Sequence, residues 1–340
     1  GRFLRHFVYE GFNVDEKVRR VFDGLIPHVA GGGLGFFNHR FAQPTRHNGQ
    51  HEEHLFPADV FPFTYGMESD PFTKRKDGIL RRLQSEDEKY LPKIMHTQSA
   101  AEYWHRSGSL VHTDPMGKRD VSIPDLVRAS AFGRTQHGPE PRPPTRGVAD
   151  HRANPADYRP FLRGLLQTLD TWVKDETTPP ASVYPTIKSG TLVDWSQKST
   201  GFPHLPGVRY PQVIQQPDWT YFGERFLKEK IITVDPPEIR GTYRVLVPRS
   251  DRDGNDVGTL LVPEVSVPLA TFTGWNLRRR DVGAEAALAS LKGAYLPFAR
   301  TKAERVKSGD PRLSIAERYR SREAYLARFK AACIRLVSGR

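Results

Sequence analysis

The sequence predicts an α/β protein, and three observations carry this prediction. Helix-like and strand-like segments alternate through residues 1–178, in the order helix, strand, long insertion, strand, strand, helix. The strand-like segments are short apolar runs, which are typical of buried parallel strands. From about residue 179 the pattern changes to proline-marked strands and turns before a last helix. We therefore expect a core at 1–178 and a β-rich extension at 179–340 that packs on the core.

The first elements of the core are a helix, a strand and an insertion. Residues 1–10 predict a helix because apolar residues recur at helical spacing. The next apolar run, closed by three glycines in "VFDGLIPHVAGGG", is typical of a buried strand that ends in a tight loop. Residues 34–91 are irregular, aromatic and rich in His and Pro, and are too long for an ordinary connection. We expect this insertion to form a lid or a pocket wall.

Two further strands and a long helix complete the predicted core. A strand at Lys93 to Thr97 precedes a helix that starts near Ser99, and residues 127–139 predict a strand followed by a loop. The clearest helix lies in "NPADYRPFLRGLLQTLDTWVKD", with Asn154 as its N-cap and Pro155 as its first residue. Its expected apolar face comprises Phe161, Leu162, Leu165, Leu166, Leu169 and Trp172.

The extension predicts a β-hairpin, a further strand and a final helix from about Ile315 to Val337. The hairpin turn is "DRDGND" at 251–256, where Asp253-Gly254 supplies the positive φ that such a turn requires. The same residues are similar to an oxygen-rich calcium loop, but the bidentate glutamate at EF-hand spacing is missing. A hairpin turn is therefore the simpler interpretation.

Composition and charge exclude several classes of protein. With 37% hydrophobic and 11% aromatic residues, the 340-residue chain has enough apolar material for a packed core. The single Cys333 excludes a disulfide framework, and no apolar run approaches the roughly 20 residues that span a bilayer. The net charge is +12, but its 51 Lys and Arg residues are dispersed among 39 Asp and Glu residues without a recognised nucleic-acid motif. We expect neither a nucleic-acid partner nor a membrane span; localisation and oligomeric state stay open.

The strongest candidate for chemistry is His137, in "GRTQHGP" just past a predicted strand. A loop there holds an imidazole at a pocket mouth, and the ordinary pKa of histidine suits a general base; the alternative is a surface histidine. Glu102 follows the preceding strand in the same way. An acid after one strand and a histidine after the next is the order in which an α/β-hydrolase supplies its orienting carboxylate and its base.

The acid and the nucleophile leave open questions. Glu102 has a second interpretation, because a first-turn glutamate favours the helix dipole and completes a cap at Ser99. Asp114 and Asp120 are rival acids. The chain contains no G-x-S-x-G, and a strand-to-helix elbow is missing at Ser107, Ser109 and Ser130.

Histidines in the insertion offer an alternative chemistry. On one helix, His47, His51 and His54 would face together and bind zinc. However, Asn48-Gly49 breaks a helix between them, and the spacing is not the H-E-x-x-H of zinc proteases. We therefore predict that these histidines, with Trp104, line a substrate pocket, and we expect no cofactor.

Several long segments resemble a largely uncharacterised bacterial family, the alpha/beta hydrolase domain-containing proteins. The resemblance starts in "GRFLRHFVYEGFNVDEKVRRVFDGLIPHVAGGG" and "FNHRFAQPTRHNGQHEEHLFPADVFPFTYG" and continues in "EYWHRSGSLVHTDP", "GTYRVLVPRSDRDGND" and "PLATFTGWNLR". In that family an elbow of the type G-x-S-Q-S directly precedes G-R-F-L-R. The resemblance thus implies a nucleophilic serine three positions before Gly1, with His137 as the base and Glu102 as the acid.

The same resemblance implies a fold and a function. The chain would be the C-terminal part of an α/β-hydrolase sheet, with its last three strands and flanking helices, and with one sheet edge unpaired and hydrophobic. The implied function is serine-dependent hydrolysis of a small-molecule ester or acyl substrate, for which this chain alone would be inactive. The alternatives are a metal-dependent hydrolase that uses His47, His51 and His54, and a non-catalytic binding protein on a hydrolase scaffold.

Overall fold

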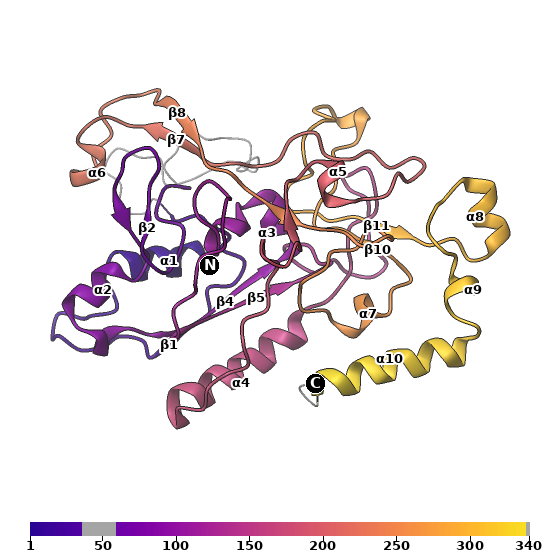
Figure 1. Cartoon of the computed structure of the whole chain (residues 1–340), viewed down its shortest axis with the longest axis horizontal. Helices are drawn as coiled ribbons and strands as arrows, with labels where there is room; N and C mark the ends of the chain where they lie inside the picture. Colours follow the sequence, from indigo (N-terminus) through magenta and orange to yellow (C-terminus); the bar gives the residue numbers. More distant parts are fainter. Residues whose placement is uncertain (36–58, 338–340) are drawn as a thin grey trace.

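A three-stranded parallel sheet forms the centre of the computed structural model, which describes residues 1–35 and 59–337 (Figure 1). Its strands lie in the order β1-β4-β5, with bounds β1 (Gly24–Leu25), β4 (Lys93–Ser99) and β5 (Val127–Phe132). Leu25 pairs with Ile94, and Thr97 pairs with Ser130. The predicted α/β class and the three predicted strands are confirmed.

Two helices cover opposite faces of this sheet, because successive side chains of a strand point to opposite sides. Ile94 of β4 packs in a cluster with Val8 of α1 (Arg2–Tyr9). Its neighbour Met95 packs with Leu169 and Trp172 of α4 (Arg159–Asp175). The third helix of the core, α3 (Ala100–His105), continues directly from the end of β4.

The start of α4 was predicted wrongly. The helix begins at Arg159, and Tyr158 rather than Asn154 is its N-cap residue. Asn154 is buried and donates to the carbonyl oxygens of Arg134 and Thr273, at 3.0 Å each. Because the Asn154 side chain makes these long-range hydrogen bonds, it does not cap the helix as the sequence pattern predicted. On the predicted apolar face, Leu166 is 62% exposed and belongs to the solvent side.

The described second half of the insertion is ordered structure rather than an irregular loop. It contains β2 (Glu68–Ser69), which pairs with β3 (Lys76–Asp77), followed by α2 (Arg81–Glu86) and the 3₁₀ helix η1 (Glu88–Tyr90). Apolar side chains from this part join the same cluster as Val8 and Ile94; they are Tyr65, Ile79, Leu80, Leu83 and Tyr90. Residues 59–91 therefore form part of the core.

The extension consists of short antiparallel pairs and short helices. The pairs are β6 (Leu192–Val193) with β9 (Val247–Pro248), β7 (Asp218–Tyr221) with β8 (Glu238–Thr242), and β10 (Ala270–Phe272) with β11 (Tyr295–Pro297). The short helices of the extension are α5 (Gln197–Thr200), α6 (Phe226–Glu229), α7 (Pro263–Ser266), η3 (Arg280–Val282) and α8 (Lys302–Ser308). The 3₁₀ helix η2 (Gly108–Val111) lies in the core. The predicted final helix is divided into α9 (Ile315–Arg318) and α10 (Arg322–Val337).

The turn at 251–256 is present, but the long hairpin expected around it is not. Gly254 has a φ of +81°, and Oδ1 of Asp251 accepts the backbone N–H groups of Asp253 and Asn255. Beyond a single antiparallel bridge between Ser250 and Asp256, the two flanking segments pair elsewhere. The turn residues were thus predicted correctly and the strand partners wrongly.

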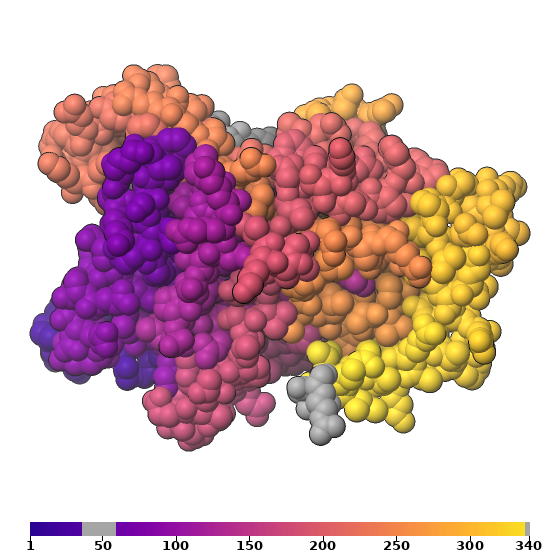
Figure 2. Space-filling view, viewed as in Figure 1, coloured from indigo at the N-terminus to yellow at the C-terminus, as the bar shows by residue number. Residues whose placement is uncertain are grey.

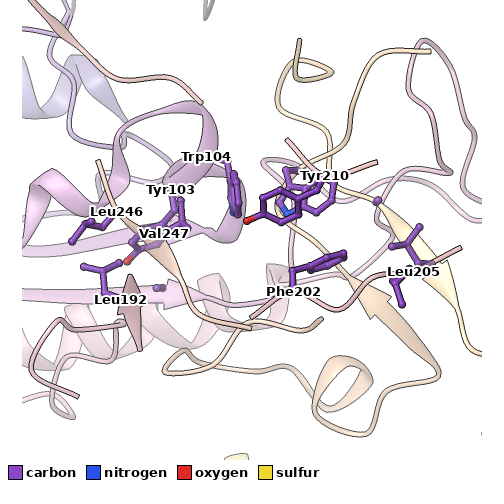
Figure 3. Packing of buried hydrophobic residues seen from close by; sticks show 12 residues of the cluster. Tyr103, Trp104, Leu192, Phe202, Leu205, Tyr210, Leu246 and Val247 are labelled. Carbon is purple, nitrogen blue, oxygen red and sulfur yellow. The ribbon is translucent and has the colours of Figure 1, made fainter. Parts of the chain in front are cut away.

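The extension is joined to the core along the outer edge of β5. The N–H of Ala131 donates to the carbonyl of Val183 at 2.8 Å, and the N–H of Leu260 donates to the carbonyl of Ala131 at 2.9 Å. An aromatic cluster also crosses the boundary, since Trp104 of α3 lies against Tyr210 (Figure 3). Its ring centroid also lies 5.8 Å from that of Trp275. The space-filling view shows the two parts in broad contact (Figure 2). The division at residue 178 stays a prediction.

The opposite edge of the sheet carries exposed apolar side chains. Among the described strands β1 pairs with β4 alone, so β1 is the other edge strand. Nearby, the ring of Phe7 lies 6.1 Å from Phe12 and 5.7 Å from Phe22, which are 50% and 46% exposed. We call the set Phe3, Phe12, Val18, Val21 and Phe22, exposed by 41–66%, the N-terminal apolar surface. In the described part of the chain, we find no helix with the length and apolar character needed to cross a bilayer.

Candidate active site

Glu102 is positioned by the cap that starts α3 at the carboxyl end of β4. Oε2 of Glu102 accepts hydrogen bonds from the backbone N–H and the hydroxyl of Ser99, each at 2.6 Å. This reciprocal capping box ties the carboxylate to the last residue of the strand. The side chain is completely buried, so its position is fixed by the sequence of the strand–helix junction itself.

His137 lies in a loop that follows β5 and is held by several polar contacts. Oε1 of Gln136 accepts the backbone N–H groups of Asn154 and Gly293, at 3.1 and 3.0 Å. The hydroxyl of Tyr158 donates to the carbonyl oxygen of His137. The His137 side chain is 30% exposed, so the loop presents a fixed imidazole that solvent can still reach.

The two side chains meet in a short hydrogen bond. Nδ1 of His137 lies 2.6 Å from Oε1 of Glu102. Burial would raise the pKa of Glu102, but the hydrogen bonds from His137 and from Ser99 outweigh it and leave the pKa below its ordinary value. The carboxylate is therefore ionised at neutral pH and accepts from Nδ1–H. This leaves Nε2 of His137 to accept a proton, which is the arrangement of a general base held by an acid.

The two rival acids accept hydrogen bonds from backbone N–H groups and do not contact His137. Oδ1 of Asp114 accepts the backbone N–H groups of Lys118 and Arg119, at 2.6 and 2.7 Å. The carboxylate of Asp120 accepts the N–H groups of residues 187 and 188, each at 2.8 Å. Of the three acids considered, Glu102 is the one that contacts His137.

A histidine also lies past the carboxyl end of β1, the remaining strand of the sheet. His28 follows β1, and its Nδ1 lies 2.8 Å from Oγ1 of Thr97. Its ring packs edge-on against Tyr158, with the ring centroids 5.3 Å apart. Burial lowers the pKa of His28 to about 4, with Glu102 opposing this shift and His137 adding to it. Sequence reasoning missed His28, although it lies just past a core strand, as His137 does.

The glycine loop after His28 holds the start of α1 near the carboxyl ends of the strands. Gly31 has a φ of +62°, and a Cβ there would lie 2.1 Å from the carbonyl oxygen of Arg106. The buried guanidinium of Arg5 donates to the carbonyls of Gly32 and Gly33, at 3.1 and 3.3 Å. A Cβ at Gly1 would lie 2.2 Å from the carbonyl oxygen of His28. The first residues of α1 are thus packed beside His28.

The remaining predicted site residues are not brought to this pair by the described contacts. His47, His51 and His54 lie outside the described residues, and their role stays a prediction. Trp104 is 2% exposed and packs in the aromatic cluster, so its role as a pocket residue also stays a prediction. Residues 1–35 and 59–337 contain no group of three or more His, Cys, Asp or Glu side chains that could hold a metal ion.

No nucleophile accompanies the pair in the described part of the chain. There, the imidazole of His137 has Glu102 as its hydrogen-bond partner and is bonded to none of the serines. Oγ of Ser109 instead accepts the backbone N–H of Leu246, and Ser107 is completely buried. Ser99 donates to the other oxygen of Glu102.

A parallel sheet with an acid after one strand and a histidine after the next is the arrangement of an α/β-hydrolase. The chain belongs to the family described as "Alpha/beta hydrolase domain", whose model matches residues 1–340. A search of curated proteins and a search of solved structures each found no match. Family membership confirms the resemblance and the fold class, and it supports a hydrolase.

Proposed function

We propose that the chain supplies the acid and the base of a serine-dependent ester hydrolase, with Glu102 and His137 in these roles. The observation that carries the proposal is the 2.6 Å contact between Nδ1 of His137 and the buried carboxylate of Glu102. Family membership supports the same class of chemistry. The substrate is proposed to be a small ester or acyl compound.

In the proposed reaction, Nε2 of His137 takes the proton from a serine hydroxyl while the serine oxygen attacks the ester carbonyl. The resulting tetrahedral intermediate expels the alcohol, which receives the proton from His137. Water then repeats the sequence on the acyl-enzyme and releases the carboxylic acid and the free serine. Glu102 remains ionised throughout and stabilises the imidazolium of His137.

We place the nucleophilic serine in a segment that precedes Gly1 in the natural protein, three positions upstream. The packing of Gly1 beside His28 supports this placement, because α1 then starts at the carboxyl edge of the sheet. A strand-to-helix elbow puts its serine at that edge, next to the acid and the base. The edge position of β1 and the N-terminal apolar surface support a preceding strand and helix that would cover them.

Activity-based labelling of the full natural chain tests this function. A fluorophosphonate probe should label one serine, which peptide mapping should locate three positions before Gly1. His137→Ala should abolish labelling, while His204→Ala, at an exposed histidine outside the site, should leave labelling unchanged. Labelling that persists in His137→Ala, or a label on a serine elsewhere, would falsify the proposal.

A further inference from the structure

His28 lies where the chemistry of the proposed site takes place. A residue of the site follows each of the three parallel strands: His28 after β1, Glu102 after β4 and His137 after β5. The ring of His28 packs against Tyr158, whose hydroxyl also holds the carbonyl of His137. The charge of Glu102 raises the pKa of His28, and that of His137 lowers it. His28 thus belongs to the same site as the acid and the base.

The contact with Thr97 fixes which ring nitrogen of His28 carries the hydrogen. Thr97 is completely buried, and its Oγ1 has Nδ1 of His28 as its hydrogen-bond partner within the described chain. If Nδ1 donated, the hydroxyl hydrogen of Thr97 would have no acceptor there, which is rare for a buried hydroxyl. Thr97 therefore donates to Nδ1, and in the neutral ring the hydrogen lies on Nε2.

Nε2 of His28 has no hydrogen-bond partner among the described residues. For the described residues no protein acceptor faces it, and it is not among their buried unpartnered atoms. Partial burial of His28 also keeps its imidazole neutral near pH 7, because it lowers the pKa of His28 to about 4. A neutral donor is suited to an ether, hydroxyl or keto oxygen, because it brings no charge to the site.

We propose that His28 binds the substrate by donating from Nε2 to an oxygen of the acyl group, so that the site prefers acyl esters with an oxygen near the reacting carbonyl over all-carbon acyl esters. This inference rests on the proposed function, since it assumes an ester substrate. Loss of one such neutral hydrogen bond changes kcat/KM by roughly 3- to 10-fold.

Matched substrates test this preference in the full natural chain. The para-nitrophenyl esters of methoxyacetic and butyric acid differ by an oxygen in place of a methylene, as do the esters of 3-methoxypropionic and pentanoic acid. The measured quantity is the ratio of kcat/KM within each pair, relative to the wild-type ratio, so that intrinsic reactivity cancels. His28→Phe keeps the ring packing and removes the donor, and should lower this ratio by roughly 3- to 10-fold for at least one pair.

Two further variants complete the kinetic test. Thr97→Val releases Nδ1 of His28 and should lower the ratio less than His28→Phe does. His204→Phe makes the same substitution at an exposed histidine outside the site and should leave the ratio unchanged. Ratios that stay within 2-fold of wild type in His28→Phe, for both ester pairs, overturn the proposal.

Nitrogen NMR of the imidazole tests the inference without turnover. In the His137→Ala protein, His28 should show the Nε2–H tautomer and no titration between about pH 5 and pH 9. Methyl methoxyacetate should shift its Nε2 resonance more than methyl butyrate does. An Nδ1–H tautomer, or equal shifts with both esters, contradicts the inference about His28. Failure of serine labelling contradicts the proposed function instead, so the two failures are distinguishable.

Discussion

Glu102 contacts His137 through one carboxylate oxygen and Ser99 through the other. Oε1 lies 2.6 Å from Nδ1 of His137, and Oε2 lies 2.6 Å from both the N–H and the hydroxyl of Ser99. Glu102 is therefore both a helix cap and the hydrogen-bond partner of a histidine. The helix cap places the carboxylate, and the free oxygen is left to orient the imidazole.

The two uses of Glu102 are separable by mutation. Glu102→Gln removes the charge that stabilises the imidazolium, and should lower kcat of the full chain by about 10³-fold or more. Ser99→Ala removes the cap hydroxyl but leaves Oε1 on His137, so it should cost about 1 kcal/mol of folding free energy and lower kcat by less than about 10-fold. Urea unfolding and steady-state kinetics measure the two effects. Equal losses of kcat in both variants would show that the cap, rather than the charge, is what catalysis requires.

Histidines whose pKa values are lowered by burial should make folding sensitive to acid. Burial lowers the pKa values of His28 and His112 to about 4, and that of His105 to about 3, from an ordinary 6.5. Below pH 6.5 the unfolded chain binds protons that the folded chain does not, so stability must fall as the pH falls towards 4. Each histidine contributes up to about 1.4 kcal/mol per pH unit in that window.

Urea unfolding of wild type and His112→Gln between about pH 4 and pH 7 checks this prediction. The variant should show a shallower fall of the unfolding free energy, because it lacks one of these protonation sites. An exposed reference, His204→Gln, should keep the wild-type slope. A wild-type stability that is flat across this range would contradict the burial of these rings.

Tyr158 should affect catalysis through the backbone of His137. Its hydroxyl donates to the carbonyl oxygen of His137, and its ring lies against His28. Tyr158→Phe keeps the ring and removes the donor, so it should cost about 1 kcal/mol of stability and lower kcat several-fold. Tyr325→Phe, at a partly buried ring in α10, is the matched control and should change neither quantity measurably. An unchanged kcat in Tyr158→Phe would show that His137 needs no such support.

Gly31 and Gly147 form a matched pair for the glycine loop. Both have positive φ, at +62° and +53°, but a Cβ at Gly31 would lie 2.1 Å from the carbonyl of Arg106, whereas Gly147 has open space. Gly147→Ala should cost about 1 kcal/mol from backbone strain alone. Gly31→Ala should cost at least about 2 kcal/mol more, because the loop must also move away from Arg106. Similar melting temperatures for the two variants would contradict the close approach.

The proposed function predicts that the N-terminal apolar surface behaves differently in residues 1–340 alone and in a chain that carries the proposed preceding segment. Phe12→Ser and Phe22→Ser remove half-exposed rings, so they should reduce aggregation of residues 1–340 with little change in melting temperature. In the full chain the proposed preceding segment covers these rings, and the same variants should destabilise the protein by about 1–3 kcal/mol. Equal behaviour in both contexts would show that nothing covers this surface.

Local patterns predicted the three core strands and selected Glu102 and His137, which the structure brings into contact, while the catalytic roles of the two stay a proposal. The strands of the core are short apolar runs, and Glu102 and His137 were found because each follows such a run in the sequence. Both signals depend on neighbouring residues, which a sequence shows directly. His28 carries the same signal and was overlooked.

Non-local contacts explain what could not be predicted. Asn154 fits a helix cap in sequence, but its side chain is used by the distant carbonyls of Arg134 and Thr273. The segments around the 251–256 turn alternate like a hairpin, yet Val247 pairs with Val193 and Leu260 bridges to Phe132. Pairing partners so far apart along the chain leave no local pattern.

The bonds along β5 have a consequence for any shortened form of this protein. A chain that ended at residue 178 would leave the peptide groups of Ala129 and Ala131 without Val183 and Leu260, and would uncover the indole of Trp104. A bare strand beside a newly exposed aromatic surface is a template for pairing with another copy. The extension thus shields β5, the strand that precedes the His137 loop, from self-association, and we expect a chain trimmed to residues 1–178 to aggregate.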